Sequence, residues 1–242
     1  MMKDTAIMIL AALLGPVIGS AAGVLLPARE ALLDQMLAFA GGTMLTISFL
    51  ELVPESILQS SVAGCAAGLM VGVFAMLALH QFLPEVPVGK GTPSRARKKQ
   101  TALLMLAAIT LHNLPEGIAM AAGGESRTML LIAVAIAMHD IPEGICTAAP
   151  YYFATGNRGR AFLLSASTAL PTLLGFALGR YLLRRIPLFS MGILTGAIAG
   201  LMIAISCEEL IPDDRGGSRA KAMPALVAGI IFVLILRGVM QP

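Results

Sequence analysis

Two short segments repeat the same charged residues in the same order. Residues 112–122 read HNLPEGIAMAA and residues 139–149 read HDIPEGICTAA, with seven of eleven positions identical. In each copy a glutamate follows the histidine by four residues, so on a helix the two side chains share one face, one turn apart. Neutral imidazole with oxygen ligands suits zinc, iron, manganese, cobalt or nickel better than calcium or magnesium. The repeat therefore predicts a site for a divalent transition-metal ion.

The chain around these segments is strongly apolar. Of its 242 residues 57% are hydrophobic and 13% charged, with a mean hydropathy of +0.84, which is typical of a membrane protein. A charged side chain at the centre of a membrane helix costs about 2.5 to 3.5 kcal/mol even on the more lenient scales. Glu116, Asp140 and Glu143 therefore need a compensating partner, and a divalent cation supplies one. A proton relay made of histidine and glutamate is the alternative.

Apolar runs long enough to cross a bilayer predict an all-α membrane protein with eight transmembrane helices in a single domain, residues 1–242. The runs cover residues 5–26, 36–57, 62–83, 101–122, 128–152, 161–183, 187–211 and 222–240. Residues 84–100 carry five basic residues and three prolines and are predicted to form a flexible loop. Eleven of the seventeen basic residues fall in the inner loops if the N-terminus is outside, so both termini are expected to be extracytoplasmic.

The two repeated segments lie on helices four and five, which alternating topology makes antiparallel. Identical motifs on antiparallel helices predict two halves related by an inverted pseudo-twofold axis around a midplane site. Pro115 and Pro142 each remove a backbone donor, which predicts a kink in both helices. Gly117 and Gly144 follow and permit close approach of another backbone.

Other residues are assigned structural roles. Cys65, Cys146 and Cys207 lie in apolar runs without a CxxC spacing and are interpreted as small packing residues. His80 has no acidic residue one turn away and is interpreted as interfacial. Glycines recur every four residues in helices three and seven, which predicts tight packing of both helices. These glycines are Gly64, Gly68, Gly72, Gly192, Gly196 and Gly200.

Read together, HNLPEGIA, HDIPEGI, MLTISFLELVPE and EELIP resemble the Zrt/Irt-like (ZIP) family of divalent metal transporters, and within it the bacterial GufA- and ZupT-like branch. The resemblance spans the whole chain. It implies a primary metal site formed by His112, Glu116, His139, Glu143 and Met44. It also implies a second metal position at Asn113 and Asp140, bridged by the two glutamates.

The same resemblance implies a route and a cargo. Glu51 matches an entrance residue, and Glu208 and Glu209 match an exit-side pair. Inward alternating-access transport of zinc is expected, with iron, manganese and cadmium as further substrates and no prosthetic group. The partners are then metal ions and the lipid of a bacterial inner membrane, without nucleic acid, and the resemblance allows a homodimer.

One position departs from the family pattern. The related branch tends to carry a glutamate before the proline of helix six, where this chain has Leu170. The second metal position would lose a charged ligand, which predicts one firmly bound ion per subunit.

Two other functions share these residue types. An intramembrane zinc hydrolase also places two ligands one turn apart, in the order HExxH, but the order here is HxxxE, with no carboxylate beside His112 to act as a general base. A proton-coupled carrier of a non-metal solute is the second alternative. Metal-free activity would favour that carrier, and release of a cleaved product without metal flux would favour the hydrolase.

Overall fold

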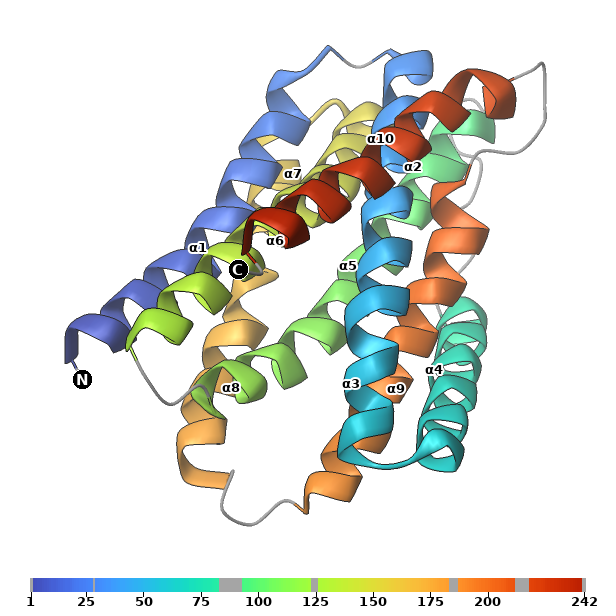
Figure 1. Ribbon diagram of the computed structural model, residues 1–242. Coiled ribbons are helices and arrows are strands. Elements are labelled where there is room, and N and C mark those ends of the chain that lie inside the picture. The colour runs from blue at the N-terminus through green and yellow to red at the C-terminus, as the bar shows by residue number, and fades with distance from the viewer. Residues whose placement is uncertain are drawn as a thin grey trace.

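The computed structural model describes residues 2–27, 29–82, 93–122, 126–182, 187–211 and 218–240, and these residues form helices without any strand (Figure 1). The elements are α1 (Met2–Leu25), α2 (Glu30–Ile47), η1 (Ser48–Leu52), α3 (Val53–Gln59), α4 (Val62–Phe82), α5 (Pro93–Ala122), α6 (Ser126–Thr155), α7 (Arg158–Ala166), α8 (Ala169–Leu182), α9 (Leu188–Ile205), η2 (Ser206–Leu210) and α10 (Ser218–Met240). The predicted all-α class is confirmed for this part of the chain.

Several helices are long and apolar enough to cross a membrane. Within the described residues these are Ala31–Gln59, Val62–Leu79, Arg158–Gly179, Leu188–Leu210 and Arg219–Gly238, and Leu13–Leu25 is a shorter apolar helix. The first of them runs unbroken through α2, η1 and α3, because η1 is a π-helical turn that inserts extra backbone without ending the helix.

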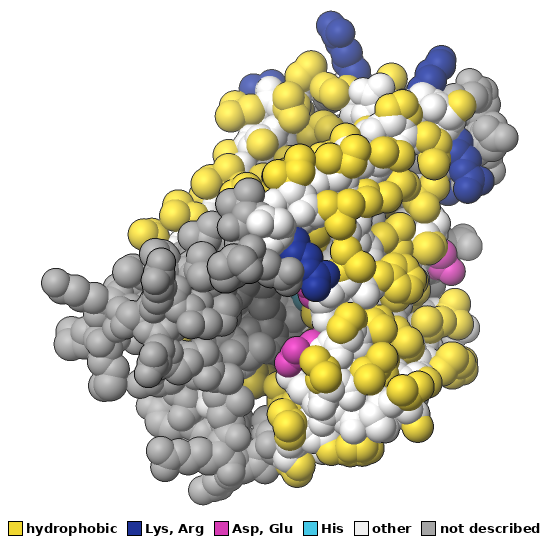
Figure 2. All heavy atoms as spheres, in the orientation of Figure 1, with side chains coloured by type: hydrophobic (Ala, Val, Ile, Leu, Met, Phe, Trp, Pro, Cys, Tyr) yellow, Lys and Arg dark blue, Asp and Glu magenta, His cyan; other side chains and the backbone are white. Residues whose placement is uncertain are grey.

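The outer surface agrees with this assignment. Large apolar side chains are exposed along several helices, among them Phe74 on α4, Leu174 on α8 and Ile235 on α10. Figure 2 shows hydrophobic side chains over most of the described surface in that view, with Lys and Arg mainly at its upper end. So much exposed apolar surface suits contact with lipid rather than with water.

Glycines set the closest helix contacts. A Cβ added at Gly72 on α4 would collide with the backbone carbonyl of Ala197 on α9, and one added at Gly200 on α9 would collide with that of Leu69 on α4. This confirms the tight packing predicted for both helices. Gly64 differs, because its nearest neighbours are the side chains of the turn that precedes α4.

Close glycine–backbone contacts also join the other helix pairs. Gly117 on α5 lies against the backbone of Thr172 on α8, and Gly144 on α6 lies against that of Pro16 and Ser20 on α1, as predicted for both glycines. Gly42 on α2 meets α10 in the same way. The structure thus pairs α4 with α9, α5 with α8, α1 with α6 and α2 with α10.

The loop predicted for residues 84–100 is wrong at its C-terminal end. Helix α5 begins at Pro93, so residues 93–100 are helical, whereas residues 83–92 lie outside the described part. Proline suits the first helical position, where its missing N–H needs no partner. Lys98, in the second turn, then donates to Asp34 on α2 at 2.6 Å. Helix α6 continues through Pro142, and a kink there stays a prediction.

Candidate metal site

Four polar side chains of the repeated segments are buried on α5 and α6, two helices that pack against each other. His112 on α5 is 5% exposed and Asn113 0%, while Asp140 and Glu143 on α6 are 0% and 4% exposed. Burial at this level requires compensation of each carboxylate's charge. That the two motifs form one site stays a prediction, and the contact between them that the described side chains show is the approach of His112 to Glu143.

His112 and Glu143 approach each other across the two helices. His112 Nε2 lies 3.8 Å from Glu143 Oε1, which is longer than a hydrogen bond. Two ligands about 2.0 to 2.2 Å from one tetrahedral ion would be roughly 3.3 to 3.6 Å apart. The pair therefore stands near the separation that a shared transition-metal ion needs.

Asn113 is held in one orientation by the turn that joins α7 to α8. Its side-chain nitrogen donates to the backbone carbonyl of Thr168 at 2.7 Å. Because the amide nitrogen is used there, Oδ1 faces the other way, and it has no hydrogen-bond partner among the described residues. Asn113 can thus offer a neutral oxygen ligand beside His112.

For two predicted ligands the structure describes the backbone but not the side chain. The side chains of Glu116 on α5 and His139 on α6 lie outside the described residues, as does that of His80 on α4. Among the side chains that are described, no three His, Cys, Asp or Glu residues lie close enough to hold a metal ion. The complete ligand set therefore stays a prediction.

Met44 lies on α2, and its side chain is 1% exposed within the main apolar core. The π-helical turn η1 begins four residues later, where the Val53 N–H donates to the Ser48 carbonyl. The Ser48 hydroxyl donates back to the Met44 carbonyl at 2.8 Å. Such π-helical turns are frequent at functional sites.

A second π-helical turn, η2, ends α9, and neither turn was predicted. Its Ile211 N–H donates to the Ser206 carbonyl at 3.3 Å. The sequence signal shared by the two turns is ISxxELxP, which occurs at residues 47–54 and again at 205–212. This repeat could have revealed that the two helices depart from α-helical geometry at equivalent places.

The predicted route residues lie on these turns. Glu51 on η1 and Glu208 on η2 are exposed, and Glu209 is half-buried. Glu209 Oε2 accepts a hydrogen bond from Thr101 Oγ1 on α5 at 2.6 Å. Because Thr101 and Lys98 belong to the same end of α5, Glu209 lies at the end of the protein where α2 begins.

Helix α8 presents no carboxylate to α5. Leu170 is 61% exposed, so its side chain points away from the interior, and Thr172 is the fully buried polar residue on this helix. The Thr172 hydroxyl has no hydrogen-bond partner among the described residues. A second metal position would therefore have only neutral oxygen donors from this helix.

The cysteines only partly follow the prediction. Cys65 and Cys146 are buried, and Cys146 Sγ lies 3.1 Å from the Glu143 carbonyl. Cys207 is exposed, so its interpretation as a packing residue is wrong. It lies on η2, where the wider turn rotates successive side chains away from the α-helical register.

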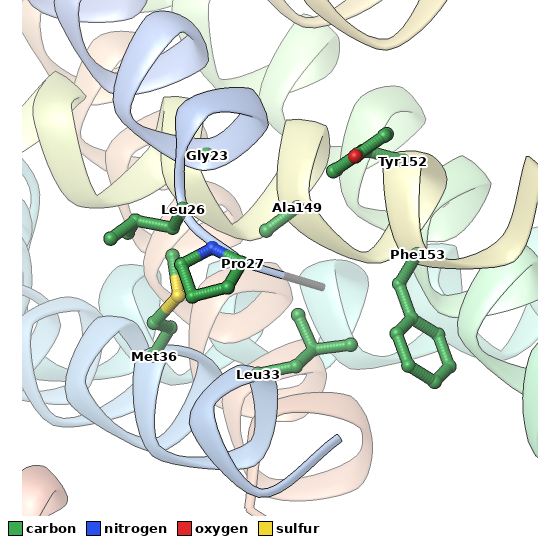
Figure 3. A pocket seen from close by; sticks show the side chains of 8 residues that line it. All are labelled: Gly23, Leu26, Pro27, Leu33, Met36, Ala149, Tyr152 and Phe153. Carbon is green, nitrogen blue, oxygen red and sulfur yellow. The ribbon is translucent and has the colours of Figure 1, made fainter. Parts of the chain in front are cut away.

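A separate pocket lies where α1, α2 and α6 meet (Figure 3). Its lining is apolar apart from Tyr152, whose hydroxyl accepts a hydrogen bond from Arg158 Nε at 3.0 Å. Pro27 lies beside Met36 in this view. Without carboxylate or imidazole groups the pocket offers no metal ligands.

Comparison with known proteins identifies the family to which the chain belongs. Residues 87–237 match the family model described as ZIP Zinc transporter. The chain is 38% identical over 222 residues to the "Zinc transporter ZupT" of Chlorobium luteolum, an alignment that covers 82% of this chain and 83% of the relative. It is 37% identical to the ZupT of Enterobacter sp. (strain 638) over 73% and 72%, and 38% identical to that of Stenotrophomonas maltophilia (strain K279a) over 80% and 79% of the two chains. With its apolar helices, the chain is thus a multi-pass membrane protein that belongs to the ZIP zinc transporter family and resembles its ZupT members.

Proposed function

We propose that this protein carries zinc, and with it iron, manganese or cadmium, across the membrane into the cytoplasm. The observation that carries the proposal is the burial of His112, Asn113, Asp140 and Glu143 on two packed helices, with His112 Nε2 3.8 Å from Glu143 Oε1. A divalent cation balances buried carboxylates that are otherwise costly in a membrane. Imidazole with carboxylate and amide oxygens is a donor set for first-row transition metals. Zinc is favoured because the relatives are named zinc transporters.

An inverted repeat of eight transmembrane helices is part of the proposal. Suppose that α1, α2–α3 and α4 correspond in order to α7–α8, α9–η2 and α10, and that α5 corresponds to α6. The α1–α6 contact should then recur as α8–α5. Likewise the α4–α9 contact should recur as α10–α2. Both pairs are present. This exchange of contacts supports two inverted halves around the α5–α6 site, an architecture that many transporters use.

The route runs from Glu51 past the midplane site to Glu208 and Glu209. At the end where α5 begins, Thr101 bonds Glu209 and Lys98 bonds Asp34, so α5 is tied to both π-turn helices there. Basic residues such as Arg158 and Arg160 follow at the start of α7. We assign this end to the cytoplasm because basic residues are retained there. Rocking of the two halves then exposes the site alternately to each side.

Uptake into proteoliposomes tests this function. His112→Ala and Glu143→Ala should each abolish zinc-dependent uptake, and Glu116→Ala combined with Glu143→Ala should leave no flux. Glu55→Gln is the matched control, because Glu55 is an exposed carboxylate bonded to Gln59 and lies away from α5 and α6. Full zinc uptake by the doubly substituted protein would show that the site assignment is wrong.

The same assay separates the alternatives. Membership of a transporter family favours transport over an intramembrane hydrolase. Counterflow of zinc driven by zinc on the opposite side requires a carrier and would not occur in a hydrolase. Flux of a solute in metal-free buffer would instead support the proton-coupled carrier.

A further inference from the structure

An apolar cavity lies between α1, α2 and α6, apart from the candidate metal site. It has a volume of about 190 Å³, and its lining residues are Leu26, Gln35, Met36, Phe39, Pro142 and Ile145. Leu26 and Gln35 are exposed, so the cavity is open to the surroundings of the bundle. Met36 and Phe39 belong to the apolar span Ala31–Gln59. The surroundings at this level of a membrane protein are lipid chains, which fill apolar space more readily than water does.

The cavity narrows toward Tyr152 on α6. The smaller pocket of Figure 3 shares Leu26 and Met36 with it and is also lined by Ala149 and Tyr152. Residues 142, 145, 149 and 152 follow helical spacing, so the two cavities lie along one face of α6. The smaller one, with a volume of about 10 Å³, holds no more than about one water molecule. An acyl chain therefore fits only the larger cavity.

A cation is held at the narrow end. The guanidinium carbon of Arg158 lies 5.2 Å from the centre of the Tyr152 ring, and Arg158 Nε donates to the Tyr152 hydroxyl at 3.0 Å. Arg158 is exposed. A guanidinium carries five N–H donors, and this contact uses one of them. The two Nη atoms can therefore bind two oxygens of a phosphate group.

The spacing of cavity and cation matches a phospholipid. Ile145, which lines the larger cavity, precedes Tyr152 by seven residues, or about 10 Å of helix. The headgroup layer on each side of a bilayer adds about 5 to 8 Å to the hydrocarbon core. A lipid whose chain occupies the larger cavity thus carries its phosphate near the level of Arg158. Gln35 adds an amide that can donate to an ester carbonyl.

We propose that this groove binds one anionic phospholipid, with an acyl chain in the cavity between α1, α2 and α6 and the phosphate on Arg158. The proposal goes beyond transport and does not depend on the metal site. A free phosphate would be satisfied by Arg158 alone, whereas a phospholipid needs both the cation and the cavity. Substitutions at the two ends therefore have different expected effects.

The first experiment tests the headgroup end. Native mass spectrometry of the full-length protein in nonionic detergent measures binding of the first phosphatidylglycerol or phosphatidylcholine with identical chains. The unsubstituted protein should bind phosphatidylglycerol about fivefold more tightly, as expected for one basic residue. Arg158→Gln should bring the ratio close to one, and Arg158→Lys should retain it. Arg160→Gln is the control, because Arg160 is also exposed but lies two residues, about 200°, further around α7.

The second experiment tests the chain end. Leu26→Trp fills the cavity, and it should weaken binding of both lipids about tenfold while leaving their ratio unchanged, because one to two buried methylene groups contribute about this much. Leu164→Trp on α7 is the control, since Leu26 and Leu164 are both 37% exposed. Thermal unfolding checks that both variants are folded. If Leu26→Trp does not fold, Leu26→Phe supplies the same reading.

Loss of the ratio in Arg158→Gln, together with weaker binding of both lipids in Leu26→Trp, supports the proposal. An unchanged ratio in Arg158→Gln overturns it, as does an equal fall in Arg160→Gln. Equal binding by Leu26→Trp and Leu164→Trp overturns the assignment of the chain to this cavity. Displacement of phosphatidylglycerol by millimolar inorganic phosphate would show a simple anion site and would also overturn it. None of these results depends on metal transport, so the proposed function stands or fails separately.

Discussion

The two π-helical turns arise from one sequence pattern but are held by different neighbours. In η1 the Leu50 carbonyl accepts a hydrogen bond from Arg237 Nη1 on α10 at 2.8 Å, and Glu51 is exposed. In η2 the half-buried Glu209 accepts a hydrogen bond from Thr101 on α5. Thus η1 is held through its backbone and η2 through a carboxylate; in the proposed orientation η1 is the outer turn and η2 the inner turn.

This difference shows which features of the turns follow from local sequence and which depend on contacts with other helices. The ISxxELxP pattern produces the same backbone geometry twice, and among the described residues a hydrogen bond ties η2 to α5, the helix that carries His112. A carboxylate bonded to Thr101 is poised to exchange that hydrogen bond for a cation arriving along α5. Under the proposed route, η2 would be the closed end, and substitutions at each turn test this.

The largest effect is expected at the glycines through which α2 and α9, the helices with π-helical turns, contact their partner helices. Gly200→Leu on α9 and Gly42→Leu on α2 would each drive a side chain into a partner backbone, and each should destabilise the protein by more than about 3 kcal/mol. Thermal unfolding in detergent measures this loss. Gly238→Leu is the control, since nothing lies within 4 Å of an added Cβ there. Similar stability of all three variants would contradict the backbone contacts.

Removing the Thr101 hydroxyl should have the next largest effect. Thr101→Val keeps the shape and removes the hydrogen bond to Glu209, which contributes about 1.5 to 3 kcal/mol because its acceptor is charged. The inner end should open more readily. A thiol reagent added from the cytoplasmic side should then label cysteines introduced near η2 about tenfold faster. Thr110→Val is the control, because that exposed hydroxyl bonds only within α5. Unchanged labelling would mean that this bond does not hold the inner end closed.

Arg237 should affect the outer turn more weakly. Arg237→Gln retains a donor for the Leu50 carbonyl but removes a positive charge near Glu51, so zinc uptake at low ionic strength should rise severalfold. The gain should shrink near 0.15 M salt, where charges more than about 8 Å apart are screened. Arg219→Gln, at the start of α10, is the control at the opposite end of that helix. A salt-independent change would exclude an electrostatic role.

The smallest effect compares the two serines that begin the turns. Ser48→Ala removes a hydrogen bond to the Met44 carbonyl and should cost about 1 kcal/mol. Ser206→Ala should be nearly neutral or stabilising, because the buried Ser206 hydroxyl has no partner among the described residues. Chemical denaturation of both variants measures the difference. Equal losses would show that the two turns are supported alike.

One contact of the candidate site could be predicted from residue spacing. The four-residue interval between His112 and Glu116 and the repeat on the next helix predicted that α5 and α6 meet, and the 3.8 Å approach of His112 to Glu143 agrees. The glycine spacing predicted tight packing between α4 and α9 in the same way. Such features are readable because helical periodicity and residue size act within a few residues of chain.

Other features depended on contacts between distant segments. The start of α5 at Pro93 places Lys98 beside Asp34, and the exposure of Cys207 and Leu170 depends on the face that each helix turns to its neighbours. Apolar composition alone does not distinguish a lipid-facing side chain from an interior one, because both surroundings are apolar.

The sequence by itself determined the helical class, the apolar spans and the order of the candidate ligand residues, since these follow from hydropathy and from 3.6-residue periodicity. Only the tertiary structure decided that Asn113 would be oriented by the Thr168 carbonyl and that Glu209 would bond Thr101. The physical reason is that hydrogen bonds between helices depend on rotation and depth, which packing of the whole bundle sets and no local pattern encodes.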